Sequence, residues 1–305
     1  MLKFAQRIAA VALLGSLMAS AGCFSRAITT PPVWLPEASA TVPAVLVTET
    51  TRPLPDPRER TASPSSQTAR ESEAPPSDNT VHGWYYTPNA QHRPPRVPNE
   101  AATFLARYRG RYLGPDPKLV YLTFDAGYEN GQTTRILDAL AHNHVRATFF
   151  VTESYIRANP DLVRRMVREG HTVGNHSATH PSMPSLASDP AAFARELERT
   201  EAAFREVTGT QMARVFRPPK GEYSALSLYR TAALGYESVF WSFAHRDWLA
   251  DDQPPPNITV RRILDGSHPG AIYLLHAVSS SNADALDEAI EGLRRQGYGF
   301  GTLGS

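Results

Sequence analysis

The chain has 305 residues, enough for one large domain or two ordinary ones, and 41% of them are hydrophobic, so part of it can bury a core. The formal charge of +1 argues against a nucleic-acid-binding protein that relies on a broad basic surface. The single cysteine, Cys23, excludes an intrachain disulfide and a Cys-rich metal cluster.

The N-terminus has the pattern of an export signal. Lys3 and Arg7 precede an apolar run over residues 8–21, which is shorter than the roughly 20 residues a bilayer span needs, and small residues end it. Cleavage after Ala21 would leave a soluble protein. Alternatively, residues 20–23 resemble a bacterial lipobox in which Ser20 replaces the usual Leu, and Cys23 would then carry a lipid. We favour residues 1–23 as a signal peptide with a lipobox, which predicts an exported, membrane-anchored lipoprotein of the cell envelope, facing the periplasm or cell wall.

Residues 24–100 differ in composition from the rest of the chain. Residues 1–100 hold 14 of the 26 prolines, and the short apolar clusters recur with neither a helical nor a strand period. Such a Pro/Ser/Thr-rich segment cannot bury enough surface to offset its chain entropy, so we expect a disordered tether. The aromatic residues at 84–86 are interpreted as an irregular lead-in that packs on the following domain, residues 101–305.

From residue 118 onward, strand and helix patterns alternate. Seven segments are predicted as strands, of which the first two read as buried: 119–124, 147–151, 171–175, 213–217, 237–243, 271–276 and 298–303. Helices are predicted at 134–142, 160–169, 190–208, 225–234, 258–265 and 283–296. Asn159 and Asp189 each precede a proline and are predicted N-caps, whereas Gly170 and Gly209 end their helices. Alternation of this kind implies parallel strands with helical crossovers.

Polar residues cluster at the ends of these strands. Asp125 ends the first strand, Arg217 ends the fourth and His276 ends the sixth. The remaining members follow the third and fifth strands: His176, His180 and Asp247. In a barrel these positions meet at the carboxyl-terminal mouth, where barrel enzymes hold their active sites. The 186 residues from 118 to 303 are short for an eight-fold barrel, so we predict a distorted, incomplete (β/α) barrel of about seven parallel strands.

Each of these side chains has an ordinary structural alternative, and their coincidence at strand ends favours a site. His176 and His180 are four residues apart, so one helical turn would aim both imidazoles the same way, as in many metal sites. Asp125 could act as a base that Arg217 keeps ionised. His276 could donate a proton, with Asp247 holding it protonated. The alternatives are turn residues, helix caps and hydrogen-bonded core histidines.

Five ordered motifs resemble those of the polysaccharide deacetylase, or NodB-homology, family of carbohydrate esterases. They are Thr123-Phe124-Asp125-Ala126-Gly127, His176 to His180, Arg217-Pro218-Pro219-Lys220-Gly221, Asp247-Trp248 and Leu274-Leu275-His276. Residues 124–131, 240–242 and 268–276 are most similar to the delta-lactam-biosynthetic de-N-acetylases, as is the lead-in at 112–114. The resemblance implies a hydrolase that acts on a non-peptide amide and removes acetyl groups from N-acetylmuramic acid in peptidoglycan.

One departure concerns the metal that the resemblance implies. The wider family has Asp-Asp in the first motif, whereas this chain has Ala126 in second place, as the muramic-acid branch also has a non-acidic residue there. The metal, which we expect to be Zn, with Mg, Mn or Co as alternatives, is left with His176 and His180. Because a catalytic zinc normally has three protein ligands, water, Asp125 or His245 is needed to complete its shell.

The implied mechanism assigns Asp125 as base, His276 as acid and a backbone N–H just after the Arg217 motif as oxyanion donor. Asp125→Asn is expected to abolish turnover and leave the fold intact. The residues expected to bind substrate are Lys220 or, second, Arg246 at the lactyl carboxylate, with Trp248, Leu274 and Tyr223 around the sugar and acetyl group. Two alternatives remain open: a deacetylase of N-acetylglucosamine or chitin-like chains, and a lipid-anchored glycan-binding module without turnover. The expected partners are peptidoglycan strands and the membrane, not nucleic acid.

Overall fold

A computed structural model describes residues 74–304 of the chain. The predicted signal peptide, the lipid attachment at Cys23 and most of the predicted tether lie outside the described residues. The strands are β1 (His82–Gly83), β2 (Gly110–Arg111), β3 (Leu119–Ala126), β4 (Thr148–Val151), β5 (Thr172–Asn175), β6 (Val215–Phe216), β7 (Glu222–Tyr223), β8 (Glu237–Val239), β9 (Phe243–Ala244), β10 (Ile272–His276) and β11 (Gly299–Phe300). The helices are α1 (Asn99–Arg107), α2 (Thr133–His142), α3 (Glu153–Ala158), α4 (Pro160–Arg168), α5 (Met183–Leu186), α6 (Pro190–Thr208), α7 (Ala225–Ala233), α8 (Pro256–Asp265) and α9 (Ser280–Arg295).

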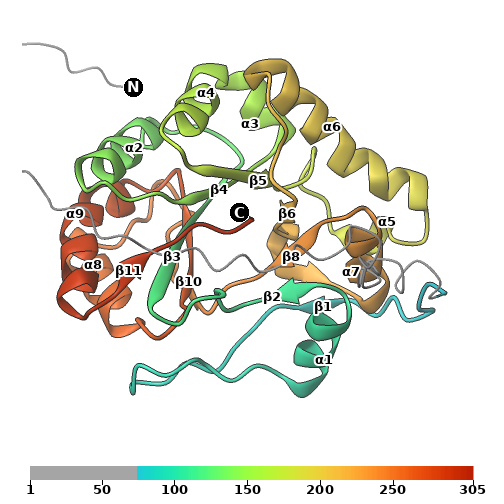
Figure 1. Cartoon of the computed structure of the whole chain (residues 1–305), viewed down its shortest axis with the longest axis horizontal. Coiled ribbons are helices and arrows are strands. Elements are labelled where there is room, and N and C mark those ends of the chain that lie inside the picture. The colour runs from blue at the N-terminus through green and yellow to red at the C-terminus, as the bar shows by residue number, and fades with distance from the viewer. Residues whose placement is uncertain (1–73, 305) are drawn as a thin grey trace, which may run out of the picture. The chain divides into compact units, whose positions relative to one another are not determined.

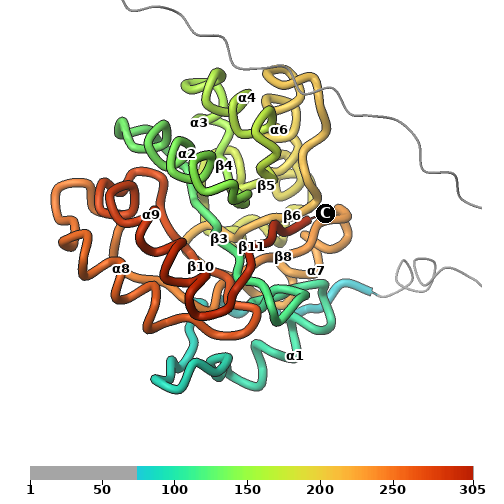
Figure 2. The backbone as a smooth tube through the Cα atoms, turned by 60° about the vertical axis from the view of Figure 1, so that its left-hand side comes forward, coloured from blue at the N-terminus to red at the C-terminus, as the bar shows by residue number. Residues whose placement is uncertain are grey.

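Within the described residues, nine strands form one sheet with helices around it (Figure 1). The strand order is β2-β8-β6-β5-β4-β3-β10-β9, with β11 also paired to β3, and each of these pairings is parallel. The predicted class, an incomplete (β/α) barrel with parallel strands, is confirmed. Figure 2, a view from another side, again places α2, α8 and α9 together on one flank of the sheet.

The curl of the sheet follows from one short connection. The sequence predicts a single strand over 237–243, but the structure has two: β8 pairs with β6 and β2, whereas β9 pairs with β10 near the other end of the order. Three residues, 240–242, join these strands. Because an extended chain advances at most about 3.6 Å per residue, the two regions of the sheet must approach within roughly 14 Å. The sheet is therefore curled into a partial barrel.

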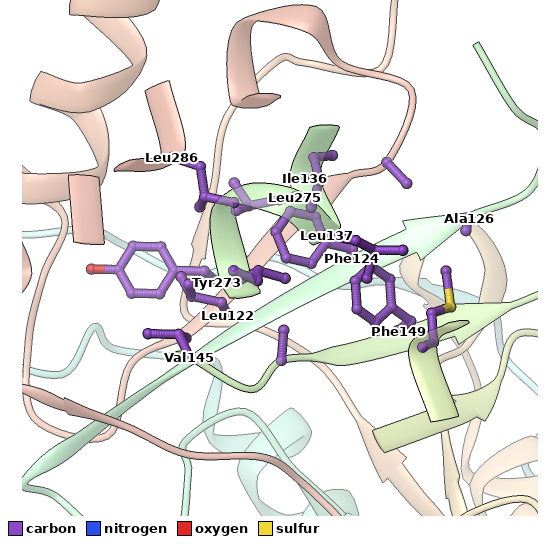
Figure 3. Close-up of a cluster of buried hydrophobic side chains, with 14 of the residues drawn as sticks. Leu122, Phe124, Ala126, Ile136, Leu137, Val145, Phe149, Tyr273, Leu275 and Leu286 are labelled. Carbon is purple, nitrogen blue, oxygen red and sulfur yellow. The ribbon is translucent and has the colours of Figure 1, made fainter. Parts of the chain in front are cut away.

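Alternate residues of β3 serve two different cores. Leu122, Phe124 and Ala126 face the helices, where they pack with Ile136 and Leu137 of α2 (Figure 3). The neighbouring residue Tyr121 belongs to a separate cluster with Phe150, Val215, Val239, Ile272 and Leu303. Since side chains alternate between the two faces of a strand, Asp125 projects on the Tyr121 face, toward the inside of the partial barrel.

Most of the predicted helices, and the residues predicted to begin and end them, are found in the structure. Asp189 caps α6 by accepting hydrogen bonds from the N–H groups of residues 191 and 192, and Gly209 ends that helix in the left-handed conformation at φ 71°. Asn159 is the N-cap of α4 and Pro160 takes the first helical position, as predicted, but the side-chain amide of Asn159 donates to the carbonyl of Tyr155 in the preceding helix, α3. That short helix was not predicted, and it takes up the residues just before α4.

The aromatic lead-in packs on the domain, so the folded unit begins before the predicted boundary at 101. β1 pairs antiparallel with β7, and the buried ring of Trp84 stacks on Phe240 with centroids 4.5 Å apart. The packing predicted for the aromatic lead-in is therefore observed for Trp84, although the domain boundary was predicted to follow it. None of the helices in residues 74–304 has the length and apolar character needed to cross a membrane.

Candidate active site

A cavity of about 1070 Å³ lies at the carboxyl-terminal mouth of the partial barrel. The predicted site residues that line it are Asp125, His176, His180, Lys220, Trp248, Leu274 and His276. Arg217 and Asp247 lie directly behind this lining, each with a side chain that is 0% exposed. The structure therefore brings the strand-end residues into one site, as the barrel prediction required.

Asp125 and His276 are set side by side by strand register. They are opposite each other in the parallel pairing of β3 with β10. Adjacent strands lie roughly 4.8 Å apart, so the two backbones approach closely without any loop being involved. A base and an acid at these positions would share one wall of the cavity.

The carboxylate of Asp125 is paired with a fully buried guanidinium. Arg217 Nη1 donates to Asp125 Oδ1 at 2.8 Å, and the guanidinium carbon lies 4.2 Å from the ring centroid of Phe150. Burial alone would raise the pKa of Asp125, but the charge of Arg217, with contributions from His176 and His276, lowers it below its ordinary value. Asp125 is therefore ionised near neutral pH and can accept a proton.

Two imidazoles lie beside this carboxylate. His176 Nδ1 donates to the backbone carbonyl of Arg217 at 2.8 Å, and burial lowers the pKa of His176 to about 4. The neutral ring thus keeps a bare Nε2, which lies 3.5 Å from Asp125 Oδ2. Two unprotonated acceptors that face each other at this distance suit a cation between or beside them. The ring of His180 is 4.9 Å from that of His176, and burial lowers its pKa as well.

These residues fit a divalent metal with a sparse set of protein ligands. Among the described residues, no group of three or more His, Cys, Asp or Glu side chains forms a complete ligand set. Ala126 has no exposed surface and belongs to the apolar cluster under α2 (Figure 3). His245, considered above as a further ligand, does not line this cavity. Its Nε2 lies 3.1 Å from Asn282 Oδ1.

The loop that carries His180 is held from a helix. The predicted helical turn over 176–180 is wrong: the segment is a loop in which Ser177 and His180 have φ values of 67° and 58°. Glu196 of α6 accepts hydrogen bonds from the N–H groups of Ala178 and Thr179 at 3.0 and 2.8 Å. These contacts hold the strained backbone in place and bring the two imidazoles together without a helix.

His276 is held by a buried carboxylate. Its Nδ1 lies 2.7 Å from Asp247 Oδ1, and its backbone N–H donates to Asp247 Oδ2 at 2.8 Å. Burial would lower the pKa of His276, but the hydrogen bond and charge of Asp247, together with the charge of Asp125, outweigh burial and raise it. Nε2 is left for the cavity, so His276 is suited to donate a proton there.

The predicted substrate residues divide into two groups. Lys220, Trp248 and Leu274 line the cavity. Tyr223 was wrongly placed there: pairing of β7 with β1 turns its ring into the cluster with Trp84 and away from the cavity.

The remaining two assignments at the cavity also need correction. Arg246 is paired with Asp252 and lines a separate cavity of about 590 Å³. The N–H groups of Gly221 and Glu222 already donate to the carbonyls of Pro218 and Pro219, so neither of these two amides serves as the expected oxyanion donor.

Two buried polar residues near the site escaped the sequence motifs. Glu196 lies on the stripe of α6 that also carries Phe193 and Leu197, and Asn282 lies on the buried face of α9 with Leu286. A polar residue on an otherwise apolar helix face was the available signal, because burying it requires hydrogen-bond partners.

Comparison with known proteins agrees with this geometry. Residues 113–239 match the family described as polysaccharide deacetylase. The chain is 40% identical to the peptidoglycan-N-acetylmuramic acid deacetylase PdaA of Bacillus subtilis, over 77% of this chain and 88% of that protein. It is 33% identical to the peptidoglycan-N-acetylglucosamine deacetylase PgdA of Listeria monocytogenes, over 61% of this chain and 38% of that protein.

Solved structures show the same relationship. The structure of Bacillus subtilis PdaA, a family 4 carbohydrate esterase, matches with a TM-score of 0.71 at 39% identity, over 74% of this chain and 96% of that one. A family 4 carbohydrate esterase from Bacillus anthracis matches with a TM-score of 0.62 at 38% identity, over 76% and 97% of the two chains. The chain therefore belongs to the polysaccharide deacetylase family of carbohydrate esterases, which are hydrolases of N-acetyl groups.

Proposed function

We propose that the protein hydrolyses the N-acetyl amide of N-acetylmuramic acid in peptidoglycan. The observation that carries this proposal is the pairing of two oppositely tuned groups across one strand register: Asp125 beside Arg217, and His276 beside Asp247. The first pair favours an unprotonated base and the second a protonated acid, as hydrolysis of an amide requires.

The chemistry follows from the positions of these groups. Asp125 takes a proton from the attacking water, whose oxygen forms the new bond to the acetyl carbon. His276 delivers a proton to the nitrogen as the C–N bond breaks, so that acetate and a free amine leave. A divalent metal held by His176 and His180 would polarise the acetyl carbonyl and acidify bound water.

Lys220 supports muramic acid as the substrate sugar. Muramic acid differs from glucosamine by a lactyl group with a carboxylate, and Lys220 places an ammonium group on the cavity lining, near enough to His180 to lower the pKa of that imidazole. Lys220 also has a positive φ of 60°, so its backbone is held in a strained conformation at the cavity. An ammonium group there would favour the acidic sugar.

The substrate proposal is tested with the full chain on peptide-free peptidoglycan. The protein is treated with chelator and assayed again with added Zn, Mg, Mn or Co, and mass spectrometry of the digested glycan shows which sugar lost its acetyl group. Metal-dependent loss from muramic acid is expected, and Lys220→Gln should reduce the preference for muramic acid over glucosamine. Loss from glucosamine alone would reject the muramic-acid assignment. Glycan binding without any turnover would instead favour the binding-module alternative.

We also propose that the protein acts in the cell envelope, anchored through a lipid on Cys23. The proposal rests on the basic start, the short apolar run and the position of the only cysteine. It agrees with a peptidoglycan substrate. Metabolic labelling with a clickable fatty acid should label the wild-type protein, and Cys23→Ser should release it from the membrane fraction. An unlabelled wild-type protein in the soluble fraction would favour cleavage after Ala21.

A further inference from the structure

A group of buried polar side chains lies behind His276, outside the cavity lining. Asp247, Asn282 and His245 are 0%, 1% and 9% exposed, and none of them lines the catalytic cavity. Asn282 comes from the first turn of α9 and the other two from the loop after β9. Buried polar side chains in proteins usually have hydrogen-bond partners. The partners of these three residues are described in turn below.

The acceptor capacity of Asp247 is shared between His276 and Asn282. Asp247 Oδ1 faces His276 Nδ1 at 2.7 Å. Asp247 Oδ2 accepts from the backbone N–H of His276 at 2.8 Å and from Asn282 Nδ2 at 2.6 Å. Asn282 supplies the one contact among these that comes from outside His276 itself. Without it, the remaining hydrogen bonds to the carboxylate would come from His276, the residue that the carboxylate is meant to orient, and the nearest other group, His245 Nε2, would lie 3.7 Å from Oδ2.

The donor and acceptor sense of this network is set from the Asp247 end. An ionised carboxylate can only accept, so Asn282 must present its NH₂ group to Asp247. The amide oxygen of Asn282 then faces His245 Nε2 at 3.1 Å and accepts from it. Burial lowers the pKa of His245, which favours the neutral ring, and the contact with the Asn282 oxygen places its single proton on Nε2. Rotation of the Asn282 amide by 180° would break both contacts.

A second tie joins the backbone of Asp247 to the same turn of α9. Gln253 Nε2 donates to the backbone carbonyl of Asp247 at 2.7 Å, and Ser279 donates from its Oγ to Gln253 Oε1 at 2.5 Å. Ser279 is also the N-cap of α9 and accepts from the backbone N–H of Asn282 at 3.0 Å. The start of this helix therefore holds both the main chain and the side chain of Asp247.

We infer that Asn282 is a positioning residue for the proton donor, acting through Asp247 to hold the His276 ring in one orientation, with its Nδ1–H directed at Asp247. The effect of this residue on kcat rests on the proposed function. Its effect on the orientation of the His276 ring does not. Other charged groups near the ring, Asp125 and Arg217, approach from β3 and β6 and contact each other, so they leave the Nδ1 side of the ring to Asp247.

Asn282→Leu tests this role, because leucine has a similar shape and can neither donate nor accept. Hydrogen bonds to charged groups are among the stronger ones in proteins, and we expect kcat for acetate release to fall about tenfold or more with little change in KM. In a His276→Ala background the same substitution should change the residual rate by less than about twofold. An equal loss in both backgrounds would mean that Asn282 serves only stability, which would overturn the inference.

Ser281→Ala is the matched control. Ser281 is equally buried in the same turn of α9, but its Oγ contacts Thr259 and not Asp247. It should lower the melting temperature and leave kcat unchanged. If Asn282→Leu does not fold, Asn282→Ala removes the same donor without adding bulk. It should lower kcat by a similar factor.

Nuclear magnetic resonance separates this inference from the proposed function. In protein labelled with ¹⁵N-histidine, His276 should show an Nδ1-bound proton with slow solvent exchange in the wild type. Asn282→Leu should speed that exchange about tenfold or more, and Ser281→Ala should not. These outcomes hold even if the wild-type protein releases no acetate. Unchanged exchange in Asn282→Leu would overturn the positioning role.

Discussion

Asp125→Asn is expected to remove turnover and also to destabilise the protein. The amide oxygen can still accept a hydrogen bond, but the charge opposite Arg217 is lost. That guanidinium has no exposed surface and lies against the ring of Phe150, so its own charge becomes buried without compensation. Removing one partner of a buried ion pair costs about 3–5 kcal/mol. The structure therefore corrects the expectation from sequence that this variant leaves the fold intact.

The size of the effect can be placed on two assays. Domains of this size change in melting temperature by about 2–4 °C per kcal/mol, so a fall of about 6–20 °C is expected by calorimetry. Loss of the general base should lower kcat about 10²–10⁴-fold in the acetate-release assay. Because Arg217 lowers the pKa of Asp125, the ion pair stabilises the protein above the ordinary pKa of 3.8. The stability difference from wild type should therefore shrink as the pH falls through the lowered pKa.

A double variant separates the two effects. In Asp125→Asn/Arg217→Met neither charge of this buried pair remains, and a methionine side chain suits a site between the rings of Phe150 and Trp241. Stability should return toward the wild-type value, whereas turnover should stay lost. If the double variant is no more stable than Asp125→Asn, the buried-charge argument is refuted. If Asp125→Asn keeps its turnover, Asp125 is not the base.

Three further predictions concern the surroundings of the reacting groups. Asp247→Asn should lower the pKa of His276, so the alkaline limb of the kcat/KM profile should move to lower pH; an unmoved limb would mean that Asp247 does not hold the proton donor in its charged form. Glu196→Ala should weaken Zn²⁺ binding about 10–100-fold by calorimetric titration, whereas Glu198→Ala, at an exposed position on the same helix, should not. Equal Zn²⁺ affinities of the two variants would show that the loop keeps its shape without Glu196. Tyr223→Phe should leave KM for the glycan unchanged, since its ring lies outside the cavity, and a several-fold rise in KM would return it to the substrate site.

Sequence patterns located the elements that have strong local signals. The eight residues of β3 read as a buried strand because each flank is covered, by helices on one face and by the barrel interior on the other. α6 was recognised by its cap at Asp189 and its terminator at Gly209. Asp125, Arg217 and His276 were each predicted at the carboxyl end of a parallel strand. The topology alone then places them at one mouth of the barrel.

The missed features depend on contacts that are distant in sequence. Residues 237–243 contain the apolar stretch 239–241 and carry no turn signal, and only the pairing of β8 and β9 with different neighbours divides them into two strands. The loop from His176 to His180 reaches its shape through Glu196, which lies 16 residues beyond it on a helix. Tyr223 is the second residue after a family motif, yet its pairing with His82 turns it away from the cavity. In each case a partner far along the chain decides the local conformation.

The close approach of base and acid explains why each needs its own buried partner. Asp125 and His276 are opposite each other on neighbouring strands. Without further partners, the proton could pass from His276 to Asp125, which would leave neither a base nor an acid. Each charge already favours the other's charged state, since His276 lowers the pKa of Asp125 and Asp125 raises that of His276. Arg217 strengthens the first shift and Asp247 the second, so the proton stays on the imidazole over a wider range of pH. A variant that removes either partner should therefore narrow the pH range of activity from one side only: the acid side for Arg217→Met, and the alkaline side for Asp247→Asn.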